Sequence, residues 1–219
     1  DFYDSRSIDL LLNVPIPTIT GYSNQMQNIG KVQNRGMEFT LNTKNFTGGD
    51  FTWSSNFNIS FNKNKVLEVG VDGRPIYGSA PNANNAFITK PGYPIASFYG
   101  YKYLGVFQSE EELEKYPHLR NDKVGDGRYE DVNKDGKLDQ NDKTILGDNN
   151  PLFTAGFSNS FRYKNFTLDI QFTGSYGAEV FSFYKRMCGI YHGDRNGLIE
   201  QLGRWRSESE PGDGVHFRP

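Results

Sequence analysis

Three stretches of the sequence alternate apolar and polar side chains with a period of two residues: 51–62, 153–163 and 166–176. The apolar positions are filled mostly by aromatic residues, and the opposite positions mostly by Ser, Thr, Asn and Gln. This period indicates a β-strand with two different faces, because successive side chains of a strand point to opposite sides. About a dozen residues exceeds the usual five or six of a globular strand. It fits a tilted strand that crosses a membrane.

The composition agrees with such a two-faced sheet. Hydrophobic residues make up only 36% of the 219 residues, whereas aromatic residues reach 15%, with 17 Phe and 13 Tyr. No apolar run approaches 18 residues, so no transmembrane helix is predicted. The net charge of −2 and the absence of a basic run argue against a nucleic-acid surface. The predicted fold class is all-β, as part of an antiparallel transmembrane β-barrel.

Other segments complete the predicted set of strands. They are residues 8–12, 31–44, 84–90 and 95–107. The segment near 84–90 is the weakest pattern, and it is included because neighbouring barrel strands must alternate in direction. Tyr99, Tyr101 and Tyr103 are interpreted as an interfacial aromatic girdle, with a sugar-stacking surface as the alternative. A short helix is also expected near 198–206.

The lengths of the connections predict an orientation. Short turns are expected at 45–50 and 164–165, and long loops at 13–29 and 108–152. Outer-membrane barrels have short turns on the periplasmic side and long loops outside. The connection 108–152 is therefore predicted to be extracellular. It should begin with a short helix capped at Ser109, because Ser109 is followed three residues later by a glutamate.

The densest cluster of carboxylates lies in residues 131–142, inside this connection. Side-chain oxygens fall at loop positions 1, 3, 5, 9 and 12, with Gly136 at the sharp turn of position 6. This is the spacing of a twelve-residue calcium loop. The predicted ligands are Asp131, Asn133, Asp135, Lys137 (through its carbonyl), Asp139 and Asp142. Aspartate rather than glutamate at position 12 predicts weak binding, about 10⁻⁴–10⁻³ M. The alternative is an acidic loop held by Asx-turns without an ion.

Nothing in the sequence predicts an enzyme. His118, His192 and His216 have no metal-ligand spacing, and no nucleophile motif is present. Cys188 is the single cysteine, so no intrachain disulfide is possible. The opening residues lack a signal peptide and read as the middle of a folded protein. We therefore expect the sequence to be a segment of a longer chain.

Short motifs in a fixed order cover nearly the whole sequence. They are DLLLNVP at 9–15, NIGKVQNRGME at 28–38, FTW at 51–53, NKNKV at 62–66, SFYGY at 97–101, GVFQ at 105–108, GDGRY at 125–129, DVNKDG at 131–136, ILG at 145–147 and RW at 204–205. In this order they resemble the SusC/RagA-like TonB-dependent transporters of Bacteroidetes outer membranes. Each motif alone is weak, but their order is specific.

The resemblance implies a barrel of about 22 strands, plugged by an N-terminal domain. Residues 1–219 would supply about seven of its later strands, without the plug, the TonB-contacting segment or the closing strands. The implied function is import of a nutrient such as an oligosaccharide or peptide across the outer membrane, with TonB and a SusD-like surface lipoprotein as partners. The implied lumen-lining residues are Glu38, Lys44, Arg162, Asp169 and Gln171. The alternative function is that of a soluble, secreted, calcium-stabilised β-domain, acting as an adhesin or a carbohydrate-binding module.

Overall fold

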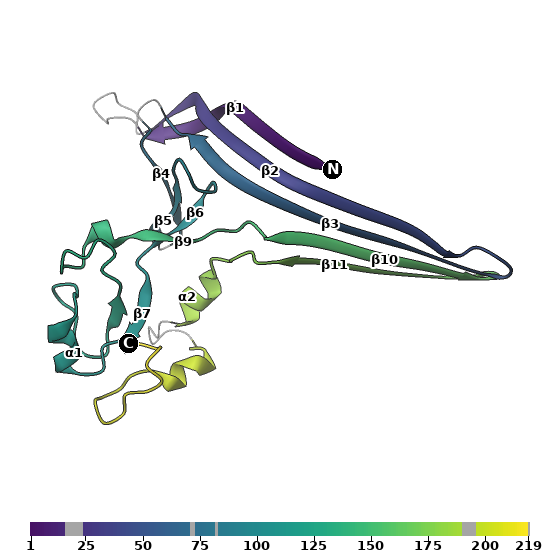
Figure 1. Cartoon of the computed structure of the whole chain (residues 1–219). Coiled ribbons are helices and arrows are strands. Elements are labelled where there is room, and N and C mark those ends of the chain that lie inside the picture. Colours follow the sequence, from purple (N-terminus) through teal and green to yellow (C-terminus); the bar gives the residue numbers. More distant parts are fainter. Residues whose placement is uncertain (16–23, 71–72, 82, 190–195, 219) are drawn as a thin grey trace. The chain divides into compact units, whose positions relative to one another are not determined.

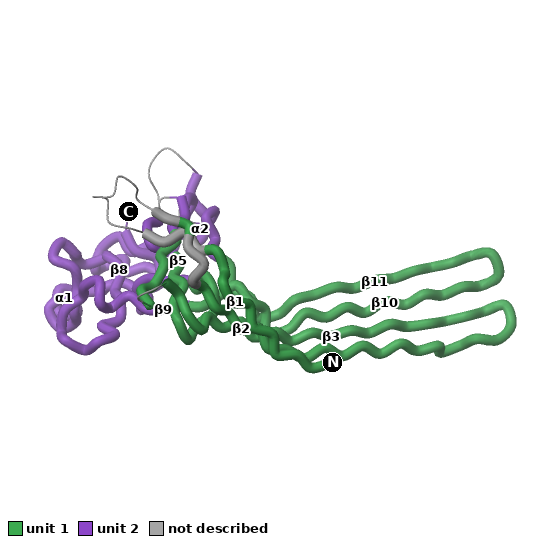
Figure 2. The backbone as a smooth tube through the Cα atoms, turned by 90° about the horizontal axis from the view of Figure 1, so that it is seen from above, with its two compact units in different colours: residues 1–78, 87–97, 147–180 green, residues 79–86, 98–146, 181–219 purple. Residues whose placement is uncertain are grey.

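The computed structural model describes residues 1–15, 24–70, 73–81, 83–189 and 196–218. These form two compact units, coloured separately in Figure 2. The sheet unit comprises residues 1–78, 87–97 and 147–180, and the loop unit comprises 79–86, 98–146 and 181–219. Among the described residues, no helix is both long enough and apolar enough to span a membrane.

The sheet unit is built on five long antiparallel strands in the order β1-β2-β3-β10-β11 (Figure 1). Their bounds are Phe2–Pro15 (β1), Asn24–Phe46 (β2), Phe51–Glu68 (β3), Phe153–Tyr163 (β10) and Phe166–Tyr176 (β11). The three alternating stretches of the sequence are thus three adjacent strands. The prediction of long two-faced strands is confirmed, and the described strands form an open sheet.

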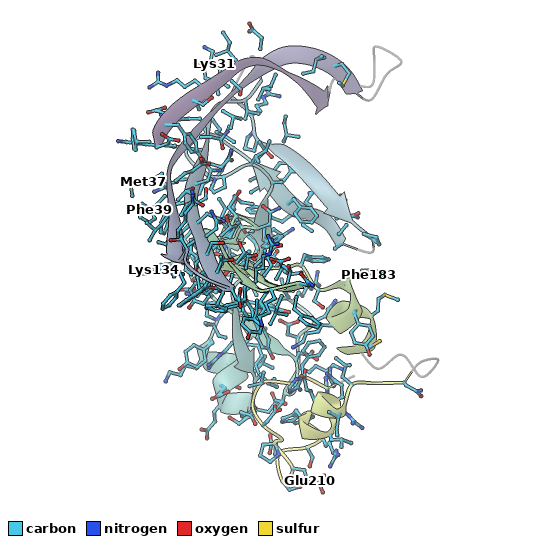
Figure 3. All side chains as sticks on the ribbon, turned by 90° about the vertical axis from the view of Figure 1, so that its right-hand side faces the viewer. Lys31, Met37, Phe39, Lys134, Phe183 and Glu210 are labelled. Atoms are coloured by element: carbon cyan, nitrogen blue, oxygen red, sulfur yellow. The ribbon has the colours of Figure 1, made fainter. Side chains whose placement is uncertain are left out.

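The register between these strands puts aromatic rows on one face. β3 pairs with β10 without a break from Phe51↔Tyr163 to Ser60↔Thr154. β10 then pairs with β11 from Tyr163↔Phe166 to Phe153↔Tyr176. Because the register is unbroken, the odd positions of β3 and β10 share one face, which we call the aromatic face. Figure 3 labels Met37 and Phe39, which lie on this face of β2.

Two of the predicted strands are placed differently in the structure. A strand does occur near 84–90, as β5 (Ala83–Thr89), but it belongs to a separate four-stranded sheet. That sheet has the order β4-β5-β6-β9, with β4 at Ile76–Ala80, β6 at Ser97–Gly100 and β9 at Thr144–Gly147. Because β3 pairs directly with β10, the strands alternate in direction without an intervening strand. The long sheet therefore has five strands, where about seven were expected.

The predicted strand 95–107 is also divided. Its first part is β6, whereas its second part is β7 (Tyr103–Val106), which pairs with β8 (Gly127–Tyr129) in a two-stranded sheet. Gly105 has a φ of +126°, and the β7–β8 register shifts at this point. Tyr103 therefore lies in a short sheet outside the five-stranded one, which removes the basis for an aromatic girdle at this tyrosine.

The two predicted long loops contain more regular structure than expected. Residues 13–15 and 24–29 belong to paired strands, and residues 16–23 lie outside the described ranges. The connection 108–152 holds β8, β9, the helix α1 (Glu110–Lys115) and a 3₁₀ turn at Gln140–Asp142. Ser109 caps α1 as predicted, since its hydroxyl accepts the Glu112 N–H at 3.3 Å. The chain then forms α2 (Phe183–Gly189) and a 3₁₀ helix at Ile199–Gly203, shorter than the predicted 198–206.

Buried hydrophobic residues are few and sit away from the aromatic face. In the sheet unit, Val32, Val66 and Val69 form a cluster with Leu10 and Ile76 packed against it. In the loop unit, the buried hydrophobic side chains are Val106, Phe107, Val124 and Leu138, with Ala86 at the limit. By contrast, all residues of β11 are exposed. Within the described ranges, no buried core covers the aromatic side chains of β11.

Candidate functional site

The polar face of the five-stranded sheet carries a ladder of asparagine amides. The side-chain amide of Asn56 donates to the side-chain oxygen of Asn42 at 2.5 Å, and the Asn58 amide donates to the Asn56 side-chain oxygen at 3.3 Å. Further along the same strands, Asn64 donates to Asn34 at 2.8 Å. The bonds to Asn42 and Asn34 cross from β3 to β2, whereas the bond between Asn58 and Asn56 lies within β3. Together they leave the face rich in neutral hydrogen-bonding groups.

Three of the five predicted lumen-lining residues meet at one hollow on this polar face. The hollow has a volume of about 710 Å³, and Lys44, Asp169 and Gln171 line it together with seryl hydroxyls and asparagine amides. Glu38 and Arg162 do not line it. Glu38 lies opposite Ser60, and the Arg162 Nε donates to the Lys164 carbonyl at 3.3 Å, near the hairpin turn. The hollow offers hydrogen bonds and one charge of each sign.

Between Phe51 and Phe61 of β3, the aromatic face is interrupted by a polar patch at Ser55. In the structure the Trp53 indole N–H and the Ser55 hydroxyl both donate to the Asn159 side-chain oxygen, at 3.0 and 2.7 Å. The Asn45 amide in turn donates to the Ser55 hydroxyl at 2.8 Å. The Trp53 ring also stacks on Phe161, with ring centroids 5.6 Å apart. The sequence did not predict a role for Asn159, because its hydrogen-bond partners are more than a hundred residues away in the sequence.

The calcium-type loop 131–142 adopts a tight turn in the loop unit. Gly136 has a φ of +79°, as a sharp turn at position 6 requires. The Leu138 side chain is buried and anchors the loop to the rest of the loop unit. The Asp131 carboxylate accepts the Lys134 N–H at 2.7 Å and the Gly136 N–H at 2.9 Å. The carboxylate of Asp131, the first predicted calcium ligand, therefore already accepts hydrogen bonds from two backbone N–H groups.

The other predicted ligands are engaged in the same way. The side-chain oxygens of Asn133, Asp135 and Asp139 each accept the N–H two residues ahead, at 2.9, 2.9 and 2.7 Å. Lys137 is part of the loop through its backbone. Within the described ranges, no group of three or more His, Cys, Asp and Glu side chains could hold a metal ion. The carboxylates thus act as turn acceptors in the arrangement that the structure describes.

Asp142 is the one fully buried acidic side chain of this loop. Its carboxylate accepts the N–H groups of Asp139 at 2.8 Å and Val132 at 3.0 Å. The N–H of Asp139 is the main cause that lowers the pKa of Asp142 below its usual value, burial acts in the opposite direction, and the Asn133 and Val132 N–H groups add to the lowering. Asp142 therefore closes the loop by joining its two ends.

Ion pairs fix the C-terminal segment within the loop unit. The Arg218 guanidinium binds both carboxylate oxygens of Asp126, at 2.7 and 3.2 Å. His216 lies 2.6 Å from Asp213, and the backbone N–H of His216 is the main cause that lowers the pKa of Asp213 to about 2. The His118 ring bonds to the Tyr116 carbonyl oxygen at 3.0 Å and packs edge-on against Phe107, and His192 lies outside the described residues. Among the described residues, these ion pairs and ring contacts serve packing, and none forms a nucleophile–base pair.

The sequence of the chain was compared with those of known proteins to identify its protein family. No family model matches the chain. The chain is 38% identical, over 94% of its length, to TonB-dependent receptor P3 of Formosa agariphila. It is 31% identical, over 83% of its length, to TonB-dependent receptor SusC of Bacteroides thetaiotaomicron. These matches cover 21% and 18% of the two receptors, so the chain spans about a fifth of their length.

A solved structure shares the fold. The structure titled as the RagAB peptide transporter superposes with a TM-score of 0.75, covering 99% of this chain and 23% of that one at 22% identity. The long antiparallel strands agree with this fold, and the two relatives above define the class as a segment of a TonB-dependent receptor. The chain is a segment of a SusC/RagA-like TonB-dependent receptor. The alternative of a soluble secreted β-domain does not account for this homology, and the homologous proteins are receptors and a transporter rather than enzymes.

Proposed function

We propose that the receptor containing this chain imports a nutrient across the outer membrane, driven by TonB and assisted by a SusD-like surface lipoprotein. The homology to TonB-dependent receptors carries this proposal. The five-stranded sheet supports it, because a wall between lipid and a lumen needs one apolar and one polar face.

In this proposal the aromatic face of the sheet meets lipid. β10 and β11 are each 11 residues long, which is the length of a tilted strand that crosses a bilayer. The short turns at 47–50 and 164–165 lie at the same end of the sheet (Figure 1). By the usual asymmetry of these barrels that end is periplasmic, and the long connection between β3 and β10 is extracellular.

The polar face would line the lumen, where Lys44, Asp169 and Gln171 form the hollow described above. Hydroxyl and amide groups bind neutral polar ligands through hydrogen bonds. This suits an oligosaccharide or a peptide backbone better than a strongly charged ligand. Glu38 and Arg162 add charges of opposite sign on the same face.

Deletion of the receptor gene tests the proposal. The deletion strain should lose growth on one oligosaccharide or peptide as the sole nutrient, and a plasmid copy of the full-length receptor should restore it. An affinity tag on the receptor should recover a surface lipoprotein from solubilised outer membranes. Unchanged growth on every oligosaccharide and peptide tested, with no lipoprotein recovered, would contradict import of this kind.

We also propose that loop 131–142 binds calcium weakly and stiffens the extracellular connection. Its spacing, the turn at Gly136 and the buried Leu138 support this. A carboxylate oxygen has two lone pairs, so one that accepts an N–H can still bind a cation. Binding would have to draw the carboxylates of Asp131, Asp135 and Asp139 closer together. Millimolar calcium should slow proteolysis of this loop in the full-length receptor, and a chelator should reverse this; equal proteolysis in both conditions would reject a structural ion.

A further inference from the structure

The aromatic face changes its chemistry abruptly at the end that leads to the long connections. Phe2, Met37 and Phe61 form one row across β1, β2 and β3. The next row on the same face is Asp4, Arg35 and Lys63, and the row after that is Arg6, Gln33 and Lys65. The registers are continuous here, so these side chains lie on the same side as the aromatic rows. Four basic groups therefore border the apolar band.

These basic groups are exposed and have few partners. Arg6, Lys63 and Lys65 form no ion pair within the part of the chain that the structure describes. The Arg35 guanidinium lies over the Phe2 ring, 5.2 Å from its centroid.

The two carboxylates nearby already accept hydrogen bonds within the chain. Asp4 accepts the Gln33 amide at 2.7 Å, and Asp148 accepts the Asn150 N–H at 2.8 Å. Arg6, Arg35, Lys63 and Lys65 outnumber these two acidic groups. The border is therefore net positive and open to an external anion.

A groove of about 490 Å³ opens between this border and the apolar band. Arg35, Lys63 and Asp148 line it together with Phe2, Met37, Phe61 and Leu152. It arises because β10 stops pairing with β3 at Ser60. The next neighbour of β3 is Tyr93, whose carbonyl accepts the Val66 N–H at 2.8 Å. Between these points, no strand that the structure describes pairs with this edge of β3.

We propose that this groove binds a phosphate-bearing lipid of the outer leaflet, with the phosphate on Arg35 and Lys63 and an acyl chain along Phe2, Met37 and Phe61. The proposal rests on the proposed function, which makes the aromatic face the lipid-facing one. Arg and Lys are the usual ligands of phosphate, and an acyl chain is stabilised by burial against apolar side chains. By the strand register these five side chains are on the opposite face from the polar hollow, so a molecule bound to them is not the imported nutrient.

Lipid binding to the purified full-length receptor in detergent micelles tests this, with phosphorylated lipid A as the probe and native mass spectrometry as the measurement. The variant R35Q/K63Q should bind about 30-fold more weakly, since each basic residue at a charged lipid surface contributes roughly fivefold. The matched control R120Q/K123Q removes the same charge from two exposed residues of the loop unit. It should bind as the wild type does, and so should R35K/K63R, which keeps both charges.

Three results would overturn the proposal: equal binding by R35Q/K63Q and wild type, equal binding of dephosphorylated lipid A, or displacement of the lipid by 10 mM inorganic phosphate. The last result would assign the basic border to free phosphate. For every variant, the change in gel mobility between unboiled and boiled samples, called heat modifiability, shows whether a barrel has folded. This separates failure of the lipid-binding proposal from failure of the proposed membrane barrel. A folded barrel without phosphate-dependent lipid binding contradicts only this proposal, whereas a wild-type receptor without heat modifiability contradicts the membrane barrel as well.

Discussion

The sheet unit and the loop unit differ in whether their large apolar side chains are exposed or buried. In β11 the side chains of Leu168 and Phe172 are 58% and 62% exposed, although both are large and apolar. In the loop unit Phe107 is fully buried, with its N–H bonded to the Asp126 carbonyl at 3.0 Å. The loop unit buries a small apolar core away from water, whereas the sheet unit buries a small valine cluster and exposes the apolar side chains of β11.

This difference shows where each unit obtains its stability. The hydrophobic effect stabilises a fold only when apolar surface leaves water. For the loop unit this happens within the chain. For the aromatic face it requires an apolar surrounding, which under the proposed function is the lipid bilayer. Substitutions in the two units should therefore report on different environments.

The largest effect is expected in the core of the loop unit. Phe107→Ala should cost about 3–5 kcal/mol, because a fully buried ring leaves a cavity. Hydrogen exchange of residues 98–146 in the full-length receptor should rise, while heat modifiability should persist. Leu119→Ala, at a side chain 39% exposed, should change exchange much less. Loss of the barrel in Phe107→Ala would break the distinction between the two units.

The next effect separates the two faces of one strand. Phe172→Arg should cost about 2–4 kcal/mol if this position lies near the bilayer midplane. Gln171→Arg places the same group on the polar face and should be tolerated. The yield of heat-modifiable receptor in outer membranes measures both. Equal yields would mean that the aromatic face does not meet lipid.

A smaller effect concerns the polar patch on the aromatic face. Asn159→Leu leaves the Trp53 N–H and the Ser55 hydroxyl without their acceptor, which should cost about 1–3 kcal/mol. Adding Ser55→Val removes one orphaned donor. It also removes the acceptor of the Asn45 amide, but Asn45 is exposed, so the double variant should recover part of this loss. Denaturant-induced unfolding of the purified receptor in micelles measures it. A double variant less stable than Asn159→Leu would show that the patch has another role.

The smallest effect is the acid sensitivity of loop 131–142. The pKa of Asp142 is lower in the folded loop than in an unfolded chain. The carboxylate therefore stabilises the loop above its unfolded pKa, and this stability is lost as the pH falls through the lower, folded pKa. Exchange protection of the loop should thus persist at pH 5 and fall below about pH 4. Asp142→Asn should abolish this pH dependence and serves as the control.

The sequence predicted local features well. The period of two in residues 153–163 and 166–176, with a turn at 164–165, describes β10 and β11 as they are. Ser109 and the glutamate three residues later predicted the start of α1. The spacing in 131–142 predicted the turn at Gly136, while the calcium ion itself stays a prediction. These features depend on residues close together in the chain, so a single sequence contains their signal.

Pairing over long distances was beyond the sequence. β3 pairs with β10 across an interval of more than eighty residues, and no local pattern distinguishes that partner from β5. The division of 95–107 into β6 and β7 was missed for the same reason, since each half finds a different neighbour. Among the lumen-lining residues, the gathering of Lys44, Asp169 and Gln171 at one hollow follows from these pairings.

By itself, the sequence determined the two-faced strands, their short turns and the family resemblance, because alternation and turn chemistry act between near neighbours. The tertiary structure decided the strand order, the polar patch around Asn159 and the groove beside Arg35 and Lys63. Each of these joins residues that are distant in sequence. Their closeness depends on which backbone hydrogen bonds form between strands, and every strand offers the same donors and acceptors to any partner.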